Sequence, residues 1–170
     1  MLDRYLHPRL KPALNATAAL LDRPAVSPDG LTLLGFAIGV LALPFLALGW
    51  YQAALAAIVL NRLLDGLDGA LARRRGLSDA GGFLDIALDF LFYALVPFGL
   101  ALAAPAENAL AAAWLLFAFI GTGSSFLAFA ALAAKHDIDN PGYAHKSFYY
   151  IGGLTEGTET IVLFVLCCLF

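Results

Sequence analysis

The chain has 170 residues, of which 61% are hydrophobic and 14% are charged, and its mean hydropathy is +0.81. A soluble domain of this size needs a much larger polar surface, so this composition excludes an ordinary soluble protein. The net charge of −3 offers no broad basic surface for nucleic acid. Its two cysteines, Cys167 and Cys168, are adjacent in an apolar run, which excludes a disulfide framework and a cysteine metal site. We expect one domain whose main solvent is lipid.

The N-terminal segment, residues 1–26, mixes charged and apolar residues. Pro8 and Pro12 limit the continuity of a helix there. The segment is also too polar to supply the apolar stretch of a signal peptide. We expect one or two short amphipathic helices that lie at the membrane surface, with a plain polar tail as the alternative.

Residues 27–170 form the expected transmembrane domain, and they contain five apolar segments. A helix needs about 20 apolar residues to cross a bilayer core. The predicted membrane helices are Leu31–Trp50, Tyr51–Leu64, Phe83–Ala104, Ala109–Ala134 and Phe148–Phe170. The second of them continues directly into a polar stretch. The sequence therefore predicts an all-α fold, a polytopic transmembrane helix bundle with an N-terminal amphipathic surface helix.

The basic residues lie in alternate connections between these segments. They precede the first helix, join the second to the third at Arg73–Arg75, and join the fourth to the fifth at Lys135 and Lys146. The positive-inside rule therefore predicts a multi-pass protein of the inner or plasma membrane, with its N-terminus and these two loops in the cytoplasm. The apolar run stops abruptly at Phe170, so we also expect a further helix beyond it.

Four aspartates interrupt the second and third segments at helical spacing. Asp65 and Asp68 are three residues apart, and Asp85 and Asp89 are four apart, so each pair shares a helix face. A short loop makes the two helices antiparallel neighbours, which brings four carboxylates together. Such a cluster is costly in a membrane unless some carboxylates are protonated or cations lie between them. Oxygen ligands favour Mg²⁺, Mn²⁺ or Ca²⁺, and two ions could hold a diphosphate.

The residues around the aspartates resemble the CDP-alcohol phosphatidyltransferase family. That family's pattern is Asp-x2-Asp-Gly-x2-Ala-Arg, a loop, and Gly-x3-Asp-x3-Asp. The matching residues here are Asp65, Asp68, Gly69, Ala72, Arg73, Gly81, Asp85 and Asp89. One departure is that the loop between Arg73 and Gly81 is about one residue shorter than expected, which affects contacts to the donor's base or sugar more than the metals. Family members usually have six membrane helices.

The resemblance implies a metal site. Asp65, Asp68 and Asp85 would bind two ions of Mg²⁺ or Mn²⁺, with help from the carbonyl of Gly66. Asp89 would also be linked to the metal and would act as general base on the acceptor hydroxyl.

The resemblance also implies the substrates. Gly69, Arg73 and Gly81 would contact the CDP part of the donor, which we expect to be CDP-diacylglycerol. A small alcohol would accept the phosphatidyl group with release of CMP, in phospholipid biosynthesis, and the protein would form a homodimer by analogy. The acceptor stays open among glycerol 3-phosphate, which the size of the chain slightly favours, inositol phosphate, serine and choline.

Further polar residues could steady a metal-bound carboxylate, a phosphate or the acceptor. These candidates are Asn61, Arg62, Glu156, Glu159, Lys135 and Lys146. Each has a structural alternative. The Arg62 side chain could extend to the membrane surface, the glutamates could form pairing contacts, and the lysines could serve topology alone.

Two other functions use similar residues. A divalent-metal transporter would explain the acids but not the glycines and Arg73 at their spacing, and it would place the acids nearer the middle of the bilayer. A membrane prenyltransferase also uses acidic motifs with Mg²⁺, but those proteins are generally longer and their motifs lie far apart in sequence. The transferase explains all of these residues.

Overall fold

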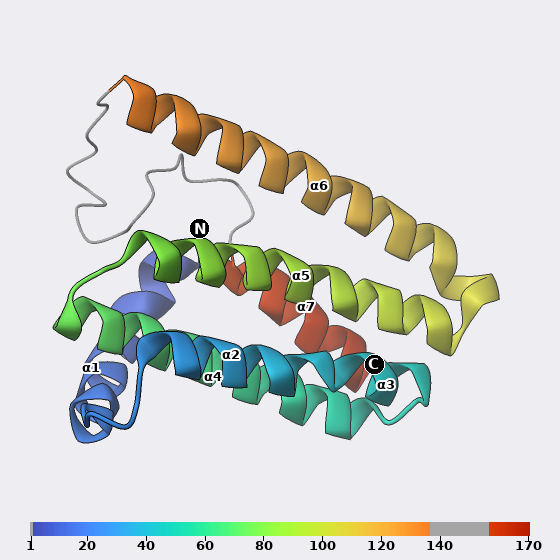
Figure 1. The fold of residues 1–170 in the computed structure, drawn as a ribbon. Coiled ribbons are helices and arrows are strands. Elements are labelled where there is room, and N and C mark those ends of the chain that lie inside the picture. Colours follow the sequence, from blue (N-terminus) through green and yellow to red (C-terminus); the bar gives the residue numbers. More distant parts are fainter. Residues whose placement is uncertain (1, 137–156) are drawn as a thin grey trace.

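The computed structural model describes residues 2–136 and 157–170, and nearly all of them are helical (Figure 1). The helices are α1 (Asp3–Leu21), α2 (Pro28–Val40), α3 (Ala42–Ala47), α4 (Tyr51–Arg75), α5 (Asp79–Ala103), α6 (Pro105–Lys135) and α7 (Gly157–Leu169). These ranges contain no strand. The predicted all-α bundle is therefore confirmed.

The N-terminal segment forms one helix, α1, which continues through Pro8 and Pro12. It runs across one end of the bundle, whereas α2, α4, α5 and α6 run along it (Figure 1). Ala18 is fully buried, and Leu14 packs against the backbone of Gly66 in α4. These contacts tie α1 to the bundle and help to hold it in one piece despite the two prolines.

The first predicted membrane helix is divided into α2 and α3. It begins at Ser27, whose Oγ accepts a hydrogen bond of 3.0 Å from the N–H of Gly30, with Pro28 in the first turn. The helix α2 ends at Val40, four residues before Pro44. In a continuous helix the N–H of residue 44 would donate to the carbonyl of Val40. Pro44 has no N–H, and its ring clashes with that carbonyl, so Pro44 accounts for the break.

Three segments of the described chain are long and apolar enough to cross a membrane, namely Pro28–Ala47, α5 and α6. The helix α4 has 25 residues, a length of about 37 Å, but it carries charged side chains within its second half. The helix α7 has 13 described residues, and the start of the expected fifth segment lies outside the described residues. The protein is an integral membrane protein with a helical bundle.

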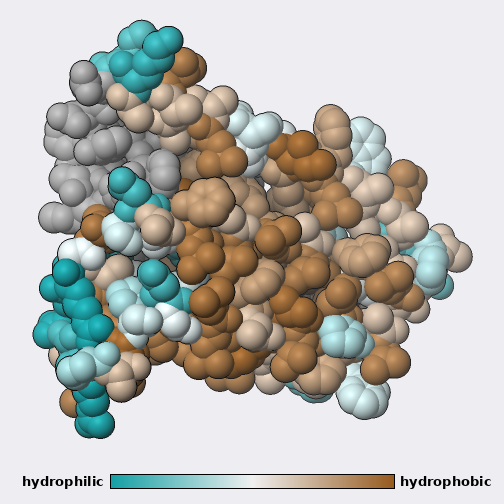
Figure 2. All heavy atoms as spheres, in the orientation of Figure 1, coloured by the Kyte–Doolittle hydropathy of each residue, from teal (hydrophilic) through white to brown (hydrophobic). Residues whose placement is uncertain are grey.

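The main core cluster combines small side chains, which let the helices approach closely, with larger aliphatic and aromatic ones. It contains Ala42, Leu46, Ala54, Ala57, Ile58, Phe92, Val96, Phe164 and Cys168. The surface outside it is broadly apolar, while hydrophilic residues gather mainly at one end (Figure 2). This end carries α1 and the connection between α4 and α5 (Figure 1).

Arg74 and Arg75, here called the arginine clamp, link two segments of the chain at that hydrophilic end. Arg75 donates a hydrogen bond of 2.8 Å from Nε to Oδ1 of Asp22, and its other nitrogens donate to the backbone carbonyls of Arg23 and Val26. Arg74 donates to the second oxygen of Asp22 at 3.3 Å. Two of the three consecutive arginines therefore fasten the connection between α1 and α2 to the end of α4.

Candidate active site

A polar cavity lies where α2, α4 and α5 meet. Its lining comes from Thr32, Gly35 and Phe36 of α2, from Asn61, Arg62, Asp65 and Asp68 of α4, and from Asp85, Leu88 and Asp89 of α5. All four predicted aspartates therefore face one space, although they come from two helices and span 25 positions of the sequence. The short connection after α4 returns the chain alongside it, and the helical spacing turns both pairs the same way.

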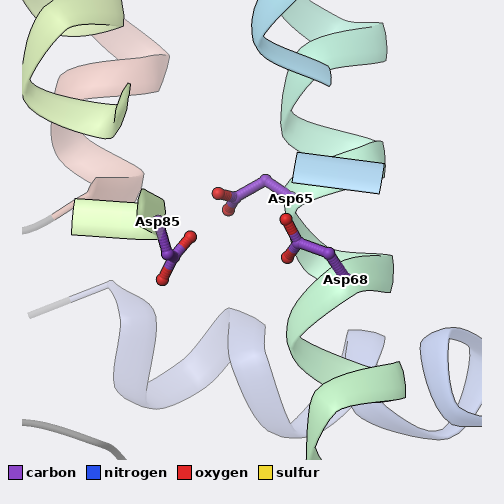
Figure 3. A group of neighbouring side chains, drawn as sticks. All are labelled: Asp65, Asp68 and Asp85. Carbon is purple, nitrogen blue, oxygen red and sulfur yellow. The ribbon is translucent and has the colours of Figure 1, made fainter. Parts of the chain in front are cut away.

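Three of the aspartates form a compact group. Asp65, Asp68 and Asp85 each offer a carboxylate oxygen, and these oxygens lie within 4.8 Å of one another (Figure 3). Asp68 is only 4% exposed, and its Oδ2 has no hydrogen-bond partner among the described residues. A buried carboxylate oxygen without a partner is costly. A cation would satisfy it, and three carboxylates suit a hard divalent ion such as Mg²⁺, Mn²⁺ or Ca²⁺.

The fourth aspartate, Asp89, is held by an arginine. Nη2 of Arg62 lies 2.7 Å from Oδ1 of Asp89, and Nη1 of Arg62 lies 3.5 Å from Oδ2 of Asp65. The guanidinium also lies 4.7 Å from the centre of the Phe92 ring and 5.5 Å from that of Tyr93. Only 16% of the Arg62 side chain is exposed. It turns into the bundle, so the structure does not support the alternative that this side chain extends to the membrane surface.

Asn61 connects this arginine to α2. Its Nδ2 donates a hydrogen bond of 2.9 Å to the carbonyl of Gly35, and its Oδ1 accepts one of 2.7 Å from Nε of Arg62. A Cβ at Gly39 would lie 2.9 Å from Nδ2 of Asn61 and 2.9 Å from Cδ2 of Phe92. Glycine at this position therefore makes room for the buried amide that orients Arg62.

The glycines predicted to contact the donor lie beside charged side chains. A Cβ at Gly69 would lie 3.3 Å from Nη1 of Arg73, so that guanidinium folds back over the glycine. A Cβ at Gly81 would lie 3.0 Å from Oδ1 of Asp29. Gly66, predicted to offer its carbonyl to the metal, presents its Cα to Leu14 of α1. The structure thus shows a packing contact for Gly66, and its role toward a metal stays a prediction.

Of the other predicted polar residues, the two that the structure describes, Lys135 and Glu159, do not line the cavity. Lys135 is the last residue of α6 and is exposed. Glu159 of α7 accepts a hydrogen bond of 2.7 Å from the backbone N–H of Leu2, so it ties α7 to the start of α1. Glu156 and Lys146 lie outside the described residues.

Sequence reasoning missed the contribution of α2 to the cavity. Thr32 lies beside Asp68, and Phe36 lies one turn further along the same helix. Asp29, one turn before Thr32, approaches Gly81. These residues are spaced three and four apart, so they share a helix face. That spacing was the available signal, but a threonine and a phenylalanine in an apolar helix are common and point to no particular chemistry.

Comparison with known proteins provides several relatives. Inner membrane protein YnjF of Escherichia coli strain K12 is 82% identical over 170 residues, which cover all of this chain and 82% of that protein. An archaetidylinositol phosphate synthase of Pyrococcus horikoshii is 40% identical over 102 residues, which cover 57% of this chain and 52% of that protein. A bifunctional IPC transferase and DIPP synthase of Rubrobacter xylanophilus is 42% identical over 96 residues, which cover 56% of this chain and 22% of that protein.

No solved structure matches the chain. The sequence model of CDP-alcohol phosphatidyltransferases matches residues 25–170, which include α2 to α7 and every residue of the acidic cavity. The geometry of the site, with two aspartate-bearing helices side by side, agrees with that match. This integral membrane protein therefore belongs to the CDP-alcohol phosphatidyltransferase family, whose members transfer phosphatidyl-type groups from CDP-alcohols.

Proposed function

We propose that this chain transfers a phosphatidyl group from CDP-diacylglycerol to a small alcohol, with divalent metal and with release of CMP, in the inner membrane. The observation that carries the proposal is the group formed by Asp65, Asp68 and Asp85, with an unpartnered carboxylate oxygen buried within it. A divalent cation in this group would neutralise a diphosphate, which the carboxylates alone would repel. The YnjF relative, an inner membrane protein by name, supports the location.

The residues of the cavity have separate roles in this proposal. Asp65, Asp68 and Asp85 hold Mg²⁺ or Mn²⁺, two ions once the donor is bound. Asp89 accepts the proton of the acceptor hydroxyl, a step that requires a carboxylate within hydrogen-bond reach of that hydroxyl. It lines the same cavity as the metal group, on the helix that also carries Asp85.

The donor's nucleotide lies, in this proposal, at the hydrophilic end of the cavity. Arg74 and Arg75 form ion pairs with Asp22, whereas the guanidinium of Arg73 lies over Gly69. In this proposal Arg73 is therefore the arginine that donates hydrogen bonds to a phosphate of the donor. Gly81 leaves space for the sugar or base beside Asp29.

The reaction is a direct displacement at the β-phosphorus. The acceptor oxygen forms a bond to that phosphorus, the bond to the bridging oxygen breaks, and CMP leaves with the bonding electrons. The acceptor's proton passes to Asp89. The positive-inside arrangement of the basic residues supports a cytoplasmic position for the N-terminus and for this site, and analogy within the family supports a homodimer.

The names of the relatives bear on the acceptor. Two of them, from Pyrococcus horikoshii and Methanothermobacter thermautotrophicus, are named archaetidylinositol phosphate synthases. This supports a phosphorylated polyol, with inositol phosphate tested first and glycerol 3-phosphate second, ahead of serine and choline.

The test is an acceptor screen with the purified protein, CDP-diacylglycerol and Mg²⁺ or Mn²⁺. The expected result is release of CMP and formation of a phospholipid with at least one phosphorylated polyol, and loss of both when EDTA removes the metal. CMP release that persists in EDTA would contradict the metal-dependent mechanism. Metal flux into liposomes without CMP release would favour the transporter, and transfer from a prenyl diphosphate would favour the prenyltransferase.

A further inference from the structure

A buried amide lies between the backbone of α2 and the charged groups of the cavity. Asn61 belongs to α4, directly before Arg62, and is only 3% exposed. Its Nδ2 donates a hydrogen bond to the carbonyl of Gly35, and its Oδ1 accepts one from Nε of Arg62. The proposed reaction uses neither end of this amide, so the side chain needs another explanation.

Only a side chain with a donor and an acceptor satisfies both neighbours of Asn61. The carbonyl of Gly35 accepts hydrogen bonds, whereas the guanidinium of Arg62 only donates them. An aspartate would face the carbonyl with a second acceptor, and a leucine of similar shape would bond to neither group. The space is also narrow, because a Cβ at Gly39 would lie 2.9 Å from Nδ2 and 3.1 Å from Cγ of Asn61. Chemistry and space therefore both favour the amide.

The guanidinium that this amide holds faces carboxylates from two helices. Nη2 of Arg62 lies 2.7 Å from Oδ1 of Asp89 in α5, and Nη1 lies 3.5 Å from Oδ2 of Asp65 in α4. The nitrogens of a guanidinium form one rigid planar fork. Fixing Nε therefore restricts both contacts at once, and with them the orientation of the two carboxylates.

We infer that Asn61 is a positioning residue, which acts through Arg62 to orient the carboxylates of Asp65 and Asp89 at the metal centre. The inference rests on the proposed function, and it adds the backbone of α2 to the parts of the protein that shape this centre, since the amide is anchored to Gly35. One oxygen of each carboxylate faces the guanidinium, and each carboxylate keeps a second oxygen for the metal ions or the acceptor. Asn61 carries no charge, so its effect on the centre is one of geometry.

A neutral positioning residue has a measurable consequence for metal binding. Asn61→Leu keeps the charge and the approximate shape of the side chain but releases Nε of Arg62. Its affinity for Mn²⁺ should fall about 10-fold, the lower end of the range for groups that orient metal ligands. The carbonyl of Gly35 keeps a helical partner, since Gly39 follows it by four residues within α2. Asn61→Ala makes the same comparison with a smaller side chain if the leucine variant does not fold.

A double-variant cycle separates this role from a purely structural one. Arg62→Lys keeps the positive charge but lacks Nε and the planar fork, so it should weaken Mn²⁺ binding at least as much as Asn61→Leu does. If Asn61 acts through the guanidinium, adding Asn61→Leu to Arg62→Lys should change the affinity by less than about twofold. Independent effects would instead multiply, with a further loss of about 10-fold in the double variant.

Leu64→Ala is the matched control for the contact between α2 and α4. A Cβ at Gly35 would lie 3.1 Å from Cβ of Leu64, so this side chain packs on the same glycine as Asn61 but offers no polar group. The variant should lower the temperature of thermal unfolding, because it removes packing. It should leave the affinity for Mn²⁺ unchanged.

The experiment is equilibrium dialysis with Mn²⁺ on the detergent-purified full chain, with thermal unfolding measured on the same preparations. A loss of affinity in Asn61→Leu that disappears in the Arg62→Lys background, with normal affinity in Leu64→Ala, would support the inference. Normal affinity in both Asn61 variants, equal losses in both backgrounds, or the same loss in Leu64→Ala would overturn it even if CMP release is normal. An unmodified protein that neither binds Mn²⁺ nor releases CMP would reject the proposed function, and the inference with it.

Discussion

The helix α5 has two faces that border very different regions. One face brings Asp85 and Asp89 to the polar cavity with α2 and α4. The other borders an apolar groove against α6, where it contributes Phe83, Ile86, Ala87, Phe90 and Ala94. In the cavity most polar groups have a named partner at a short distance, and glycines make room for them. The groove is lined by side chains that differ little in chemistry, so substitutions should be costly on the first face and tolerated on the second.

The largest effect is expected at Asp68. Asp68→Asn should lower turnover at least about 100-fold, the loss typical when one electrostatic element of an active site is removed. It should also leave the thermal stability of the metal-free protein equal or higher, because it removes a buried negative charge, one of whose oxygens has no hydrogen-bond partner among the described residues, from an acidic group. CMP release and thermal unfolding, measured on the same preparation, check both parts. Near-normal turnover in this variant would show that the group of three aspartates is not the metal site.

A second effect is expected from closing the space that Asn61 uses. Gly39→Ala should lower the free energy of unfolding by about 1–3 kcal/mol, because its methyl group would overpack Asn61 and Phe92. Gly121→Ala is the matched control, since nothing lies within 4 Å of a Cβ at that position in α6, and helix propensity favours alanine by up to about 1 kcal/mol. Thermal unfolding in detergent compares the two. Equal effects at both glycines would mean that the packing around Asn61 does not constrain the site.

A smaller effect is expected in the groove. Ile120, on α6, is 71% exposed. Ile120→Leu should change the free energy of unfolding by less than about 0.5 kcal/mol and leave turnover unchanged, since exposed apolar positions away from specific contacts tolerate such changes. The same two assays apply. A loss of turnover as large as that of Asp68→Asn would remove the contrast between the two faces of α5.

The smallest effect is expected at the arginine clamp. Hydrogen bonds from Arg75 and Arg74 hold the pKa of Asp22 below its ordinary value despite the opposing effect of burial. A lowered folded-state pKa means that the ion pair stabilises the protein above the ordinary aspartate pKa, and that this contribution is lost as the pH falls through the folded-state value. Asp22→Asn should therefore melt slightly below the unmodified protein near pH 7, and the difference should shrink on acidification. A difference that is constant with pH would contradict this assignment.

The sequence predicted the bundle and the gathering of the aspartates because both follow from periodicity. Apolar length marks the membrane helices, and spacings of three and four residues turn each pair of aspartates to one face. The break before Pro44 was readable from the same rules but was not predicted. The continuity of α1 through Pro8 and Pro12 was harder to foresee, because packing against α4 overrides the local preference.

The inner arrangement of the cavity could not be predicted in the same way. Arg62 and Asp89 are 27 positions apart, and their ion pair depends on how α4 and α5 are rotated and on the amide of Asn61. Helical spacing places a residue on a face, but it does not give the distance between side chains of two helices. Arg62 could therefore be named as a candidate from the sequence, while its partner and its inward orientation came only from the structure.

The most direct test of a shared metal centre is anomalous diffraction from crystals of the protein soaked in Mn²⁺. We predict a peak bounded by the carboxylates of Asp65, Asp68 and Asp85, and its loss in Asp68→Asn. A peak elsewhere with none between these three side chains, or one that survives in Asp68→Asn, would contradict the account.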